Sequence, residues 1–90
     1  MNSYEINTVF RYTGGGIRVY TCLRIIEENL YGVLQMNYVP SSIDSATGGV
    51  LDEINSEAFQ LMIDEDPIGR LKWTPSLEEA ISAHDIAFDN

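Results

Sequence analysis

Two segments with the composition of β-strands lie on either side of a run of glycines: Tyr4-Glu-Ile-Asn-Thr-Val-Phe-Arg-Tyr12, then Thr13-Gly-Gly-Gly16, then Ile17-Arg-Val-Tyr-Thr-Cys-Leu-Arg-Ile-Ile26. Aromatic and β-branched residues dominate both sides of the glycines, which predicts strands over 4–12 and 17–26. A four-residue loop joins them into an antiparallel hairpin whose side chains alternate between two faces. The loop sets these residues opposite one another on one apolar face: Tyr12 and Ile17, Phe10 and Val19, Thr8 and Thr21, Ile6 and Leu23, Tyr4 and Ile25.

A third strand is predicted over 30–39, because Leu30 to Val39 is again rich in β-branched and aromatic residues. A two-residue turn at Glu28-Asn29 would join it to the second strand, since asparagine tolerates positive φ. That turn would set Leu23 opposite Leu34, Thr21 opposite Met36 and Val19 opposite Tyr38. The result would be a three-stranded antiparallel meander with one strongly apolar face.

The rest of the chain predicts helices. Residues 40–50 are rich in turn formers and predict a long loop. A helix is expected over 56–65, with Ser56 as N-cap and an apolar stripe of Phe59, Met62 and Ile63. Residues 68–73 could form a short fourth strand, which Gly69 weakens. A second helix is expected over 75–88, begun by Thr74-Pro75 or by a Ser76/Glu79 capping box. Its expected inner face comprises Leu77, Ala80, Ile81, His84 and Phe88.

Together these elements predict an α+β fold in the order βββ-α-β-α, as one domain over residues 1–90. An antiparallel meander of three to four strands would carry both helices on its apolar face, because that face must be covered. The opposite face is mixed in polarity and would be left to solvent. It would offer a partner, or a second copy in a homodimer, an apolar patch with an arginine rim. We assign to this sheet outer face Arg11, Arg18, Tyr20, Tyr31 and Val33, unless the loop or the C-terminal residues cover it.

The charge is strongly asymmetric along the chain. Fourteen acids against five Lys and Arg give a net charge of −9, and all of that excess lies in residues 44–90. Direct nucleic-acid binding is not expected, because phosphates require a basic surface. The acids serve either as a solvated surface that aids solubility or as an acidic face for a basic protein partner. We assign to this acidic face Asp52, Glu53, Glu57, Asp64, Glu65, Asp66, Glu78 and Glu79.

Catalytic and metal-binding residues are sparse. Cys22 and His84 are the only thiol and the only imidazole, and no orienting carboxylate can be placed between them. Asp64 to Gly69 is similar to the opening of a calcium loop, but Ile68 and Pro75 occupy positions where that loop needs oxygen ligands. We therefore expect no enzyme activity, no cofactor and no metal site.

Anion binding is a weaker alternative. Gly14-Gly15-Gly16 could offer backbone N–H groups to an anion, although a strand rather than a helix follows them. Arg11 and Arg18 would face each other across the hairpin, and like charges in that position are unfavourable. A bound anion or an acidic side chain would relieve this repulsion, unless both arginines simply extend into water.

The favoured function is binding to a protein partner with a basic surface. A specific version is an inhibitor that presents carboxylates where its target expects phosphates, as phage antagonists of bacterial defence and immunity proteins against nuclease toxins do. The alternatives are a small module that binds an anionic ligand and a homo-oligomeric structural protein. No apolar run approaches the ~20 residues of a membrane span, and no signal peptide is evident, so a cytoplasmic location without membrane contact is expected.

Overall fold

An antiparallel sheet with two helices forms the fold in the computed structural model, which describes residues 2–40 and 47–89. The strand order is β1-β2-β3, and the element order βββ-α-α is that of an α+β protein. The elements are β1 (Tyr4–Thr13), β2 (Gly16–Ile25), β3 (Leu30–Pro40), α1 (Thr47–Asp64), the 3-10 turn η1 (Pro67–Gly69) and α2 (Leu77–Asp89).

The predicted register of the first hairpin is confirmed. Phe10 lies opposite Val19 and Ile6 lies opposite Leu23, as the glycine loop required. Even-numbered residues of β1 and odd-numbered residues of β2 therefore share one face of the sheet. The other face carries Val9, Arg11 and Tyr20.

The predicted register of the second hairpin is wrong. Residues 26–29 form a longer turn than expected, in which Asn29 has a φ of 53°, and Leu23 lies opposite Gly32 instead of Leu34. A bulge then leaves Leu34 without a partner, because Cys22 pairs with Val33 while Thr21 pairs with Gln35. An extra residue on one strand reverses the side-chain alternation beyond it. Met36 and Tyr38 consequently share a face with Tyr20, not with Val19 as predicted.

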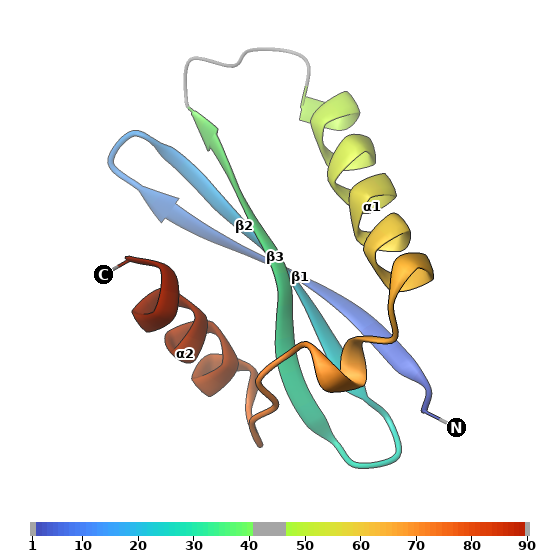
Figure 1. Ribbon diagram of the computed structural model, residues 1–90. Coiled ribbons are helices and arrows are strands. Elements are labelled where there is room, and N and C mark those ends of the chain that lie inside the picture. Colours follow the sequence, from blue (N-terminus) through green and yellow to red (C-terminus); the bar gives the residue numbers. More distant parts are fainter. Residues whose placement is uncertain (1, 41–46, 90) are drawn as a thin grey trace.

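The two helices cover opposite faces of the sheet, which corrects the prediction that both pack on one face (Figure 1). Ala58, Leu61 and Met62 of α1 pack with Leu23 and Leu34. Ala80 and Ile81 of α2 pack on the other face in a second core cluster with Tyr20, Cys22 and Val33. Partly buried apolar residues lie at the border of this cluster: Val9, Tyr31, Met36 and Leu77. Both faces of the sheet are apolar enough to need a helix, since β2 is almost wholly buried.

Helix α1 begins nine residues before the predicted start at Ser56, inside the predicted loop; residues 41–46 of that loop lie outside the described residues. Its buried stripe begins with Ile54 and Ala58 and continues to the half-buried Leu61 and Met62. These residues recur every three to four positions, as on one side of a helix. The side that faces the sheet therefore differs from the predicted stripe of Phe59, Met62 and Ile63.

The predicted fourth strand over 68–73 is wrong. Asp66 caps the η1 turn by accepting a hydrogen bond from the Ile68 N–H, and Pro67 opens that turn. A single bridge between Tyr31 and Thr74 replaces a strand, with N–H···O distances of 2.7 and 2.8 Å. The segment runs close to the sheet at Gly32, where an added Cβ would lie 3.1 Å from the Trp73 ring.

Helix α2 begins at the predicted capping box. The Glu79 N–H donates to Ser76 Oγ at 3.1 Å, and the Ser76 hydroxyl donates to the Glu79 carboxylate at 3.2 Å. Ser76, not Thr74, is thus the cap. Ala80 and Ile81 are buried as predicted, whereas Phe88 is largely exposed and packs against the His84 ring at a centroid distance of 4.5 Å.

Candidate functional site

A polar cluster joins β1 and β2 to α2 through Asp85. This carboxylate accepts a hydrogen bond from the Tyr20 hydroxyl at 2.8 Å and from Arg11 Nη1 at 3.2 Å, and Arg18 Nη1 lies 3.7 Å from it. Arg11 also lies over the Tyr20 ring, 5.6 Å from its centroid. Arg11 and Arg18 face each other as predicted, and an acidic side chain relieves their repulsion. Asp85 is thus the acidic side chain that was expected, as an alternative to a bound anion, between Arg11 and Arg18.

The sheet outer face is not free for a partner, which corrects that expectation. Helix α2 covers it, so that Tyr20 is fully buried, Val33 is buried and Tyr31 is half-buried. Arg11 remains exposed and Arg18 is half-buried beside Asp85. The predicted apolar patch with an arginine rim is therefore core and its border.

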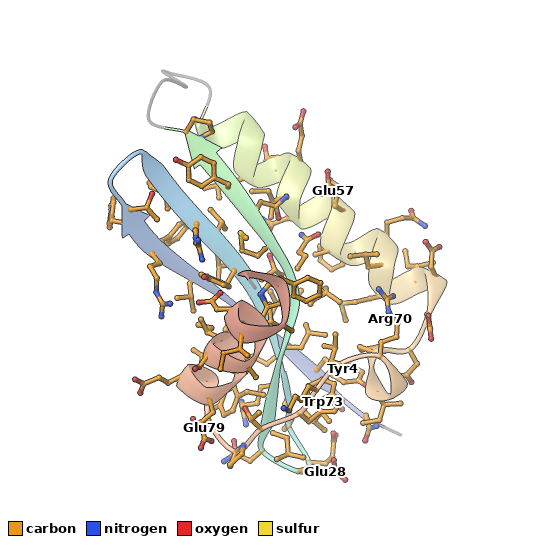
Figure 2. The ribbon with its side chains drawn as sticks, turned by 60° about the vertical axis from the view of Figure 1, so that its left-hand side comes forward. Tyr4, Glu28, Glu57, Arg70, Trp73 and Glu79 are labelled. Atoms are coloured by element: carbon orange, nitrogen blue, oxygen red, sulfur yellow. The ribbon has the colours of Figure 1, made fainter. Side chains whose placement is uncertain are left out.

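The eight predicted acidic residues do not form one face. Those of α1 lie on one side of the sheet and Glu79 lies at the start of α2 on the other, as Figure 2 shows for Glu57 and Glu79. Glu65 pairs with Arg70 at 3.7 Å, and Asp66 is engaged by Tyr4 and Ile68. The eight residues therefore fall into three groups. Four lie on α1, Glu65 and Asp66 lie in the loop after it and are held by partners, and Glu78 and Glu79 lie at the start of α2.

The exposed side of α1 is the strongest candidate site. All four carboxylate side chains of the helix are exposed, and the helix contains no lysine or arginine. Phe59 is 57% exposed and Ile63 is 77% exposed, one helical turn apart. We name this surface the α1 outer face, which comprises Asp52, Glu53, Glu57, Phe59, Ile63 and Asp64.

Sequence reasoning missed Phe59 and Ile63, because it assigned both to the core. The residue that would have identified the buried side of the helix is Ile54, which lay outside the predicted helix. Extending the helix to Ile54 places Ile54 and Ala58 in the core stripe and turns Phe59 and Ile63 away from it. Exposed apolar side chains with a polar rim are typical of a protein interaction site.

The structure places Cys22 in the core and Asp66 at the start of a turn. Cys22 is buried, and burial raises the pKa of its thiol to about 12, so that it is not ionised near neutral pH. No group of three or more potential metal ligands occurs among residues 2–40 and 47–89. Asp66, in the segment similar to a calcium loop, instead caps the η1 turn.

A groove with a volume of about 320 Å³ opens between α2 and residues 70–72. Apolar side chains such as Val33, Leu34 and Phe88 line it, together with Arg70, Lys72 and His84. Two of the five Lys and Arg residues of this acidic chain therefore lie at one groove.

The Tyr4–Asp66 hydrogen bond joins β1 to the start of η1, and it should make stability depend on pH. The Tyr4 hydroxyl donates to Asp66 at 2.6 Å, and this bond, followed by the Ile68 N–H, lowers the carboxyl pKa below its ordinary value of 3.8. The folded protein therefore favours the ionised carboxylate. This preference adds to the free energy of unfolding above pH 3.8, and the gain is lost as the pH falls through the lower pKa that Asp66 has in the folded protein.

We expect Asp66→Asn to lower the melting temperature at pH 7 and to lower it less at pH 3, below the ordinary carboxyl pKa of 3.8. Asp52→Asn is the matched control, since it makes the same charge change on the exposed side of α1. Thermal melts at both pH values check this expectation. Equal melting temperatures for the two variants at pH 7 would contradict it.

Comparison with known proteins found no match: no protein-family model, no curated protein and no solved structure resembles the chain. Its own structure therefore defines its class, an α+β protein with a three-stranded antiparallel sheet between two helices. Within the described part of the chain, no helix combines the length and apolar character needed to cross a membrane.

Proposed function

We propose that this chain is a non-enzymatic cytoplasmic protein that binds a protein partner with a basic surface through the α1 outer face. The observation that carries the proposal is the combination on one helix of exposed carboxylates that form no ion pair with a described residue and two exposed apolar side chains, Phe59 and Ile63. Elsewhere in the described chain, prominent carboxylates such as Glu5 and Asp85 are engaged by arginine.

The spacing of these residues supports a helix that docks into a groove. Phe59 and Ile63 stand at positions i and i+4, the usual spacing of anchors in helix-in-groove recognition. Glu53 and Glu57 are also four residues apart, which places their Cα atoms about 6 Å apart along the helix axis. The partner surface is therefore an apolar groove with a basic rim.

An inhibitor of a nucleic-acid-binding protein fits this surface best. Such a target carries a basic surface for phosphates, and a row of carboxylates can occupy that surface in their place. The charge would steer the encounter, while Phe59 and Ile63 would slow dissociation. Phage anti-defence proteins and immunity proteins against nuclease toxins are the classes that this mode of action favours.

Selective capture tests the proposal. The wild type, Glu53→Gln/Glu57→Gln and a control, Glu28→Gln/Glu78→Gln, are immobilised and exposed to a lysate of the source cells. Both variants lose two charges, but Glu28 lies in the β2–β3 turn, away from Glu57 (Figure 2). We expect a basic protein that the wild type and the control retain and the α1 variant loses.

Kinetics with the captured protein should show the cause. The association rate of the α1 variant should fall by roughly threefold to tenfold, and that of the wild type should fall with added salt, because the Debye length is only about 8 Å at physiological ionic strength. Indistinguishable capture by all three proteins would contradict the proposal.

A further inference from the structure

The outer edge of β1 has unpaired backbone groups. β1 is an edge strand, paired only with β2. The Ile26 N–H donates to the Ser3 carbonyl at 2.9 Å. Because backbone groups alternate in direction along a strand, the odd-numbered residues of β1 direct their N–H and C=O groups toward β2. The even-numbered residues from Ile6 to Tyr12 therefore direct theirs outward, and no backbone group of the described chain bonds to them. The edge of β3 differs, because Thr74 pairs there with Tyr31.

The same residues expose apolar side chains. Ile6 is 37% exposed, Phe10 is 49% exposed and Tyr12 is 81% exposed, all on the face that α1 only partly covers. β1 contains no proline, no lysine and no bulge over its ten residues. Edge strands that stay unpaired are usually protected by such features, so β1 has the properties of a pairing surface.

We propose that β1 pairs antiparallel with β1 of a second copy of this chain, with Thr8 opposite the partner's Thr8. The outward hydrogen bonds allow only registers in which even-numbered residues face even-numbered residues. Among these, the registers centred on Thr8 and on Val9 overlap the strands most fully, and only the Thr8 register pairs opposite charges across the two strands. It joins the two three-stranded sheets into one continuous six-stranded sheet.

This register is complementary in charge and in polarity. It sets Glu5 opposite the partner's Arg11, and the two-fold symmetry repeats this pair. It also sets Ile6 opposite the partner's Phe10. Glu5 and Arg11 hold their intrachain partners, but their side chains remain 45% and 49% exposed, which leaves each of them accessible to a second charged group. A shift of two residues in either direction would lose the charge pair.

Disulfide trapping tests the register. Cys22 is fully buried, so Thr8→Cys creates the one accessible thiol. Directly opposite hydrogen-bonded residues have Cα atoms about 5.5 Å apart, within the usual range for a disulfide. Phe10→Cys is the control, because the two copies of residue 10 would lie roughly 14 Å apart along the strands. We expect Thr8→Cys to form the disulfide dimer about tenfold faster or more, and a mixture of Ile6→Cys and Phe10→Cys to form the mixed dimer.

Sedimentation over a range of concentrations tests the dimer itself. We expect the wild type and Ile63→Lys to dimerise and Phe10→Lys to remain monomeric, since both changes place a lysine at an exposed apolar position. A monomeric wild type, a dimer insensitive to Phe10→Lys, or equal trapping of Thr8→Cys and Phe10→Cys would overturn the proposal. Ile63→Lys should also lose the partner captured through the α1 outer face, so the two proposals can fail separately.

Discussion

Tyr20→Glu is expected to unfold the protein at 25 °C. Tyr20 is fully buried beneath α2, and its hydroxyl donates to Asp85. The substitution removes a large ring from the core, which costs about 3 to 5 kcal/mol, and leaves a carboxylate in an apolar cluster close to Asp85. A domain of this size has a free energy of unfolding of roughly 5 to 13 kcal/mol, so little or no stability would remain.

Tyr20→Phe separates the ring from the hydroxyl. This control keeps the ring and loses only the hydrogen bond to Asp85, for an expected cost of about 1.5 to 3 kcal/mol. Circular dichroism and urea denaturation of both variants provide the measurement. A cooperatively folded Tyr20→Glu protein with near-wild-type stability would show that α2 does not cover this face of the sheet.

Leu23→Ala is expected to cost about 2 to 5 kcal/mol. Leu23 is fully buried on the opposite face, in the cluster that joins Leu34 of β3 to Ala58 of α1. Its truncation leaves a cavity between the sheet and α1 that neither can readily close. Ile63→Ala is the control, because this exposed residue should change the free energy of unfolding by less than about 0.5 kcal/mol.

Urea denaturation of these two variants decides whether α1 is packed as described. Equal losses for Leu23→Ala and Ile63→Ala would mean that the buried and exposed sides of α1 are wrongly assigned. The α1 outer face would then lose its structural basis, since it depends on the same phase of the helix.

Local chemistry explains why the first hairpin was predictable. The short glycine loop fixes the register, and the alternation of Ile6, Phe10, Val19 and Leu23 fits only one pairing. The second hairpin lacks such a constraint. Asn29 does adopt positive φ as predicted, but in a four-residue turn, and no residue of β3 signals that Leu34 forms the bulge.

The placement of the helices depends on tertiary packing that the sequence did not reveal. Arg18 and Arg24 flank Tyr20 and Cys22 on one face of β2, so this face has the pattern of a half-exposed surface. Arg18 is accommodated instead at the border of α2 beside Asp85, and Arg24 pairs with Glu5. The segment around η1 carries the chain from one face to the other, and its single bridge to Tyr31 is too short for a strand pattern.

The candidate site was predictable in charge but not in shape. The excess of acids located the surface on the second half of the chain, and the α1 carboxylates are indeed exposed. Gly48 and Gly49 predicted a loop, which shortened the expected helix and shifted its phase. Phe59 and Ile63 were consequently assigned to the core, so the apolar part of the α1 outer face emerged only from the structure.

Photo-crosslinking from α1 in the source cells is a direct test of whether this helix contacts a basic protein. A benzophenone amino acid would replace Ser56, which is exposed on α1 between Asp52 and Phe59, or Glu28 in the β2–β3 turn as the control. We expect a crosslinked basic protein from position 56 that is absent from position 28 and is lost in Glu53→Gln/Glu57→Gln. No adduct from position 56, or the same adducts from both positions, would contradict it.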